Sequence, residues 1–164
     1  MSSQSILQSG NVTPNHAAVW AADGVLKDGG GTPAAQRVLA SLRGANFNTT
    51  NDQPIVIPLN FVAFQITGII ITNASISLTT AAGGFYPAAA KGGTPIVSAA
   101  QAYSALTTSA GLLQATLAAF GSGTRFSAAN LASLGGLLAV YFSLTTAQGA
   151  TASADLYVCG IDLS

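Results

Sequence analysis

Residues 154–161 read Ala-Asp-Leu-Tyr-Val-Cys-Gly-Ile, and this stretch decides the fold class of the chain. Successive side chains of a β-strand point to opposite faces. One face would therefore carry Leu156 and Val158, and the other would carry a tyrosine, a cysteine and an isoleucine. Because both faces are apolar, the pattern predicts a strand in the middle of a sheet or at an interface.

Similar β patterns fill the chain from residue 46 onward, with Gly, Pro, Asn and Ser between them. The predicted strands are Ile55–Pro58, Val62–Thr72, Ser75–Thr80, Ile96–Leu106, Leu112–Leu117, Leu137–Thr146 and Ala154–Ile161. Their spacing favours a sandwich or barrel over alternating βαβ units. Residues 76–83 and 142–149 share a Ser-Leu-Thr-Thr-Ala core followed by a glycine, as two equivalent strand-to-loop exits of a sandwich would; chance similarity in an Ala/Thr-rich chain is the alternative.

The first 45 residues have a different character. Residues 1–13 are polar and lack periodicity, which indicates an extended arm. The next segment, His16 to Asp28, contains Asp23-Gly24 between two short apolar runs and predicts a β-hairpin. An isolated hairpin is marginal in water, so this one must pack against the body or another subunit, with Trp20 as its anchor.

A short helix is predicted over residues 34–43. Thr32 would cap its start, Pro33 would occupy its first position, and Gly44 would end it. The predicted fold is therefore mainly β: a jelly-roll-like antiparallel β-sandwich over residues 46–164, preceded by an attachment segment, residues 1–45, with an arm, a hairpin and this helix.

Charge is unusually scarce. Only 6% of the 164 residues are charged, with five Lys or Arg, five Asp and no Glu, against about 25% in an average soluble protein. The cations are scattered, which argues against nucleic-acid binding. No apolar run reaches the length of a membrane helix, and the N-terminus lacks the pattern of a secretory signal. A surface this poor in charge is typical of a protein covered by neighbours in an assembly.

The sequence offers little for catalysis or for a metal or cofactor. His16 is the single histidine and Cys159 the single cysteine, and zinc sites need clusters of such residues. The glycines at 29–31 lead into the predicted helix without the Lys-Ser/Thr of a phosphate-binding loop. We therefore expect no catalytic residue, metal or cofactor, and an enzyme is the least favoured class of function.

Residues 9–29, Ser-Gly-Asn-Val-Thr-Pro-Asn-His-Ala-Ala-Val-Trp-Ala-Ala-Asp-Gly-Val-Leu-Lys-Asp-Gly, resemble an N-terminal module of structural proteins of tailed bacteriophages and prophages. Asn15 stands where that module has glycine. Residues 45–57, 69–86 and 143–149 are similar to small β-sandwich virion proteins encoded in phage head and tail gene clusters. The two resemblances together cover most of the chain.

The resemblance implies a structural protein of the virion, made in the bacterial cytoplasm and located on the capsid exterior. Such proteins include capsid decoration (cement) proteins, often trimers that bridge major capsid subunits, and head or tail fibre adaptors, which could bind a host glycan. Both roles stay open at this point, and neither needs nucleic acid or a membrane. The interface residues expected from the hairpin and from a loop are Val19, Trp20, Val25, Leu26, Phe85 and Tyr86. For Phe85 and Tyr86 the alternative is a loop tip folded back on the core.

Overall fold

The computed structural model describes residues 16–20, 26–31, 36–107 and 109–163, with side chains from residue 36 onward. The chain divides into two compact units, Met1–Ala35 and Gln36–Ser164. In the first unit, β1 (His16–Trp20) pairs antiparallel with β2 (Leu26–Gly31), which places Trp20 opposite Leu26. The predicted hairpin pairing is confirmed, while its Asp23-Gly24 turn lies outside the described residues.

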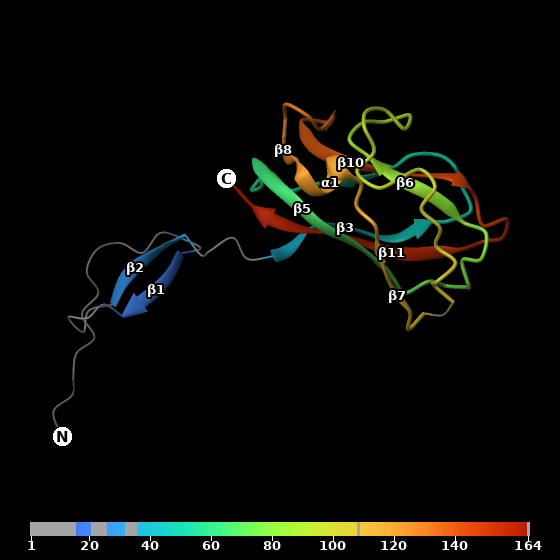
Figure 1. The fold of residues 1–164 in the computed structure, drawn as a ribbon, viewed down its shortest axis with the longest axis horizontal. Helices are drawn as coiled ribbons and strands as arrows, with labels where there is room; N and C mark the ends of the chain where they lie inside the picture. Colours follow the sequence, from blue (N-terminus) through green and yellow to red (C-terminus); the bar gives the residue numbers. More distant parts are fainter. Residues whose placement is uncertain (1–15, 21–25, 32–35, 108, 164) are drawn as a thin grey trace, which may run out of the picture. The chain divides into compact units, whose positions relative to one another are not determined.

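The second unit is mainly β and contains two antiparallel sheets (Figure 1). One sheet has the order β3-β11-β5-β7, with β8 also paired to β5; the other has the order β4-β10-β6, with β9 paired to β10. The elements are β3 (Gln36–Asn46), β4 (Gln53–Val56), β5 (Ala63–Thr72), β6 (Ala82–Tyr86), β7 (Leu112–Ala115), α1 (Ala119–Gly123), β8 (Arg125–Ser127), β9 (Ser133–Leu134), β10 (Leu137–Thr146) and β11 (Ser153–Asp162).

Aromatic side chains join the two sheets in one hydrophobic core. Phe142 of β10 lies 5.0 Å from Phe47, which directly follows β3, and 5.1 Å from Phe85 of β6, measured between ring centroids. Tyr103 packs edge-on against Phe47 at 5.2 Å. Aromatic pairs at these separations add stabilisation beyond the area they bury, so this cluster fixes the two sheets together.

The helix predicted over residues 34–43 is wrong. The segment forms β3, which pairs with β11 from Gln36 to Asn46. Val38 is 52% exposed whereas Leu39 is 2% exposed, as expected for neighbours on opposite faces of a strand. The local helix signals are weak compared with pairing along a buried central strand. The second compact unit begins at Gln36 and thus includes β3.

Predicted strands over residues 75–80 and 96–106 are also absent; there, Val97 makes only isolated bridges to Phe85 and Leu117. Conversely, β6 was not predicted, because its Gly83-Gly84 pair resembles a turn. A Cβ on Gly84 would lie 2.4 Å from the Val97 carbonyl oxygen, so glycine here permits two chain segments to approach closely. The remaining predicted strands correspond to β4, β5, β7, β10 and β11.

The two repeated segments lie against each other, although only the second is a strand. The Thr80 hydroxyl donates to the Gln148 carbonyl oxygen at 2.7 Å. The side-chain Oε1 of Gln148 accepts from the Thr80 and Ala81 backbone N–H groups, each at 3.2 Å. The first copy is thus a loop held by the end of the second, and the predicted equivalence of the two exits is wrong.

Candidate functional site: the outer face of the five-stranded sheet

The central position predicted for residues 154–161 is confirmed, since β11 lies between β3 and β5. Leu156 and Val158 point into the core and are fully buried. The intervening side chains point to the opposite side of the sheet, which we call the outer face. By register, the outer face carries Val38, Ser41, Arg43, Gly68, Ile70, Thr72, Leu112, Gln114, Asp155, Tyr157, Cys159 and Ile161.

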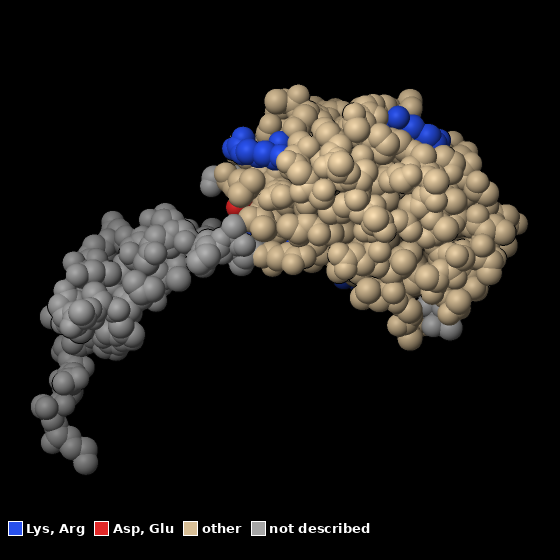
Figure 2. Space-filling model, viewed as in Figure 1, with Lys and Arg blue, Asp and Glu red and all other residues tan. Residues whose placement is uncertain are grey.

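The outer face is mixed in polarity: its apolar side chains include Val38, Ile70, Leu112, Tyr157 and Ile161, and its polar ones are Ser41, Arg43, Thr72, Gln114 and Asp155. Val38 is 52% exposed and Leu112 is 67% exposed. Tyr157, Ile161 and Ile70 are half-buried. Figure 2, which shows one side of the molecule, draws the Lys and Arg side chains of the second unit as separate patches near its margins. Val38 and Leu112 are thus exposed apolar side chains on the two edge strands of this face, and exposed apolar surface is a feature of interaction sites.

The outer side of the other sheet is covered by the chain itself. Tyr86 and Tyr141 lie opposite each other on β6 and β10, and only 3% and 6% of their surfaces are exposed. With Ala139 they form a second small core, against which Ala99 and Ala132 pack. The backbone N–H of Ala132 donates to the Pro87 carbonyl oxygen at 2.8 Å and holds this cover in place. Among the described residues of the second unit the two sheets therefore differ: the chain covers the outer side of one, and side chains on the outer side of the other, such as Val38 and Leu112, are exposed.

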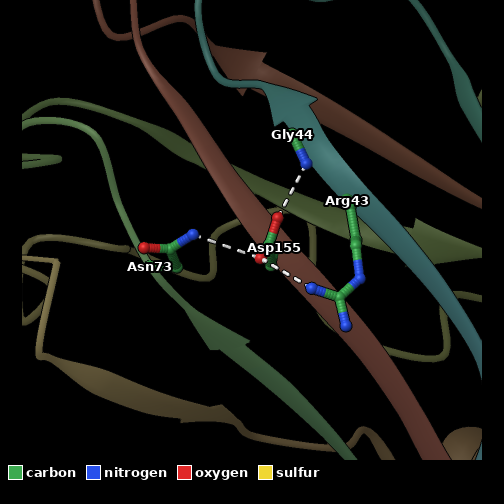
Figure 3. Close-up of polar contacts among 4 residues, drawn as sticks. All are labelled: Arg43, Gly44, Asn73 and Asp155. Atoms are coloured by element: carbon green, nitrogen blue, oxygen red, sulfur yellow. Dashed lines mark hydrogen bonds and ion pairs between the residues drawn. The ribbon is translucent and has the colours of Figure 1, made fainter.

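A buried carboxylate organises one corner of the outer face (Figure 3). Asp155 Oδ1 accepts from the Gly44 backbone N–H at 2.8 Å, and its Oδ2 accepts from Asn73 Nδ2 at 3.2 Å. The Arg43 guanidinium lies 3.9 Å from the same Oδ2. Its Cζ is also 5.8 Å from the centre of the Tyr157 ring. The charges of Asp155 and Arg43 therefore offset each other at this corner. The Asp155 carboxylate on β11 also contacts β3, through Gly44, and the residue that follows β5, Asn73.

Backbone conformation explains why glycine and asparagine occupy two of these positions. Gly44 has a φ of +65° and Asn73 a φ of +56°. These are the two residue types that enter the left-handed region most readily. Gly44, near the end of β3, and Asn73, just after β5, can therefore bring a backbone N–H and a side-chain amide to the Asp155 carboxylate.

A second ion pair lies near the opposite end of β11. The Arg37 guanidinium pairs with the Asp162 carboxylate, and its Cζ is 5.0 Å from the centre of the Phe61 ring. The Arg37 side chain is 45% exposed, so solvent screens this pair and its contribution to stability is small.

The expected loop placement of Phe85 and Tyr86 is wrong. Both belong to β6, with exposed fractions of 0% and 3%, so neither side chain is available at the surface of the described unit. Burial, and then the charge of Asp52, raise the pKa of Tyr86. Val19, Trp20 and Leu26 lie in β1 and β2, but their side chains are outside the described part, and Val25 is outside the described residues altogether.

Groups for chemistry are sparse in the described part of the chain. It contains no cluster of three or more His, Cys, Asp or Glu side chains that could hold a metal ion. Cys159 is a free thiol with 5% of its surface exposed, and burial raises its pKa, which disfavours the reactive thiolate. No helix among the described residues is long and apolar enough to cross a membrane.

An open groove of about 380 Å³ lies beside β5, where β7 has ended and β8 has not begun. Thr67, Gln114, Ala115, Thr116 and Leu117 line it, and none of them is charged. The Thr67 hydroxyl is buried without a hydrogen-bond partner. Buried polar atoms without a hydrogen-bond partner are uncommon in folded proteins, and a ligand bound in the groove can supply the partner.

Sequence reasoning found part of the outer face and missed the rest. The apolar alternation of residues 154–161 identified Tyr157, Cys159 and Ile161. Val38 and Leu112 come from strands that only the sheet topology brings beside β11. For Asp155, the available signal was a lone carboxylate inside an apolar strand.

Comparison with known proteins assigns this chain to no family. No protein-family model matches the chain, and neither a curated protein nor a solved structure matches it significantly.

Proposed function

We propose that this chain is a non-enzymatic structural protein of a virion, namely a capsid decoration (cement) protein that bridges and stabilises neighbouring major capsid subunits. The observation that carries the proposal is the outer face, which exposes the apolar side chains of Val38 and Leu112, beside a second sheet whose outer side the chain covers itself. A protein that acts by contact needs such a face. The resemblance of residues 9–29 to a phage structural module supports the virion setting.

The proposed architecture is a jelly-roll-like β-sandwich. Two antiparallel sheets that share one hydrophobic core support it. In this proposal the sandwich provides a rigid body, and the N-terminal unit attaches it to the capsid surface. The β1–β2 hairpin has only two strands, and a two-stranded hairpin gains stability by docking onto a larger partner.

The scarcity of charge suits this role. Burying an ion without its partner costs several kcal/mol, whereas burying apolar surface contributes about 25 cal/mol per Å². A chain with ten Lys, Arg, Asp or Glu residues in 164 can cover much of its surface with neighbours at little electrostatic cost. Each copy would then add contact area that resists the internal pressure of packaged DNA.

Cryo-electron microscopy of particles whose genome encodes this chain tests the proposal. Density in many copies over the head lattice is the expected result, together with heads that break at lower temperature when the gene is deleted. Density confined to one vertex or to the tail, or heads that lack the protein, would overturn the decoration role.

One observation favours a second candidate, a fibre or adaptor protein that binds a host glycan. The groove at Thr67 is uncharged and holds an unpartnered hydroxyl, which suits a neutral, hydroxyl-rich ligand. Binding on a glycan array that is lost in Thr67→Val and retained in Thr107→Val, an exposed threonine outside the groove, would support this role. The absence of any binding signal on the glycan array would contradict this second candidate function.

A further inference from the structure

We propose that the groove at Thr67 binds a small neutral sugar and rejects sugars that carry a carboxylate. This inference rests on the second candidate function above and names the chemical class of its ligand. The residues that touch the sugar are those that line the groove: Thr67, Gln114, Ala115, Thr116 and Leu117.

The groove lies where both edges of β5 lose their regular pairing. The register of β11 on β5 jumps from Gly68 to Ile66 and so skips Thr67. On the other edge, β7 and β8 leave residues 66–68 without a strand partner in the described part of the chain. Bulges in a strand redirect a side chain and are over-represented next to active sites. The irregularity therefore places Thr67 in an opening that regular strand pairing would close.

The polar groups of the groove match the hydroxyl groups of a sugar. The Thr67 hydroxyl is buried without a hydrogen-bond partner. The Gln114 side chain is exposed and lies beside Gly68, where a Cβ would be only 3.1 Å from Gln114 Nε2. Glycine at position 68 thus leaves room for the amide at the groove. A hydroxyl and an amide can each donate and accept hydrogen bonds, as sugar hydroxyls do.

The missing charge and the size of the groove narrow the class of ligand. None of the lining residues is charged, and a carboxylate that leaves water without meeting a cation pays a large desolvation penalty. Ala115 and Leu117 offer apolar surface to the C–H groups of a sugar ring. The volume of about 380 Å³ is near the lower end of small-molecule sites, about 300–1,000 Å³, and suits roughly one or two sugar rings.

Hydrogen bonds fix the chain segments around the groove. The backbone N–H of Thr116 donates to Gln101 Oε1 at 3.0 Å. The side-chain Nε2 of Gln65, on β5, donates to the Ser122 carbonyl oxygen at 2.9 Å and holds the segment that precedes β8. Groups that are ordered before the ligand arrives lower the entropic cost of binding. Gln101 is therefore a positioning residue for Thr116.

An NMR titration of the full-length, ¹⁵N-labelled protein tests the inference. The neutral probes are glucose, galactose, N-acetylglucosamine and maltose, and the acidic probes are glucuronic acid and N-acetylneuraminic acid. At least one neutral sugar should shift the amide signals of residues 114–117 and saturate them, with a Kd of roughly 1 mM because the groove is open. The acidic sugars should leave these signals unchanged.

Three variants test the contacts. Thr67→Val and Gln114→Met keep the size of each side chain and should each weaken binding by roughly tenfold, because each removes hydrogen bonds to the ligand. The matched control, Thr107→Val, alters an exposed threonine outside the groove and should bind like the wild type. Absence of binding by every neutral sugar, equal binding of the acidic sugars, or equal effects of Thr67→Val and Thr107→Val would overturn the inference.

Thermal denaturation without ligand gives an independent test of the Thr67 hydroxyl. Because this hydroxyl has no partner to lose, Thr67→Val should leave the melting temperature unchanged or raise it. A melting temperature lowered by several degrees would show that the hydroxyl is already bonded in the folded protein, and would overturn the inference.

Two further measurements separate the ligand source and the proposed functions. Binding of the same sugar at the end of an immobilised polysaccharide, compared with the free sugar, shows whether the ligand is a glycan terminus or a free sugar. A protein that is located on the tail but binds no sugar contradicts this inference alone. Sugar binding by a protein present in many copies over the head lattice supports this inference and contradicts the adaptor location alone.

Discussion

The Asp155 carboxylate accepts a hydrogen bond from the Gly44 backbone N–H at 2.8 Å, across 111 positions of sequence. This contact connects Gly44 of β3 to the central strand β11. The same carboxylate holds Asn73 at the end of β5. One side chain with 11% of its surface exposed therefore fixes the relative positions of three neighbouring strands.

Asp155→Ala should lower the free energy of unfolding by about 3 kcal/mol, because hydrogen bonds to a charged group contribute about 1.5–3 kcal/mol each and the Gly44 N–H loses its acceptor. Urea denaturation at neutral pH measures this loss. The matched control is Arg43→Ala, which removes only the exposed member of the ion pair and should cost less than about 1 kcal/mol. Equal losses in the two variants would show that the ion pair, and not the backbone contact, is what stabilises this corner.

Gly84→Ala should destabilise the fold by about 2–3 kcal/mol, as overpacking of a well-packed site does. The new Cβ would meet the Val97 carbonyl oxygen at 2.4 Å and the Ser98 carbonyl oxygen at 2.9 Å, and both are backbone atoms. Gly123→Ala is the control, since nothing lies within 4 Å of a Cβ there. Thermal denaturation compares the two, and an unchanged melting temperature for Gly84→Ala would contradict the close approach.

Strand periodicity in the sequence was sufficient to predict β5, β10 and β11, because long apolar alternation is a local signal. It also placed β11 at the centre of a sheet, since both of its faces are apolar. The prediction of a helix over residues 34–43 was wrong for a physical reason. Thr32-Pro33 and Gly44 are capping signals that act over a few residues, and pairing of β3 with β11 over its full length outweighs them.

The candidate site could be predicted only in part, because a sheet face is assembled from distant segments. Residues 154–161 revealed one apolar stripe. The neighbours of that stripe, Val38 and Leu112, depend on which strands flank β11, and strand order is not a local property of sequence. The sequence predicts a loop at Phe85 and Tyr86, because the two glycines before them indicate a turn. In the structure, Gly84 instead permits the close approach of Val97, which is not visible in the sequence.

Tyr103 should make the fold sensitive to alkaline pH. Its side chain is fully buried, and burial raises its pKa far above the ordinary value of about 10. Because the folded-state pKa is raised, this stabilising contribution is complete below about pH 10, where the unfolded tyrosine ionises, and is lost as pH rises above that value, by about 1.4 kcal/mol per pH unit.

Tyr103→Phe separates this effect from the hydrogen bond that the Tyr103 hydroxyl donates to the Gly83 carbonyl oxygen at 3.0 Å. The variant should be about 1 kcal/mol less stable than wild type at pH 7, because that bond is lost. The difference should shrink and then reverse above about pH 10. Urea titrations across this range measure both effects, and parallel pH profiles for the two proteins would contradict the assignment.

Arg37 and Arg43 should protect the free edge of β3 from pairing with other chains. Edge strands in natural proteins carry charged residues that discourage such pairing. Arg37→Thr with Arg43→Thr leaves an edge strand without charge and should aggregate several-fold faster, as followed by light scattering and thioflavin fluorescence. Arg125→Thr with Lys91→Asn changes the net charge equally but leaves β3 intact, so it should aggregate at nearly the wild-type rate. Equal acceleration in both double variants would show that net charge controls solubility and that the position of the two arginines does not matter.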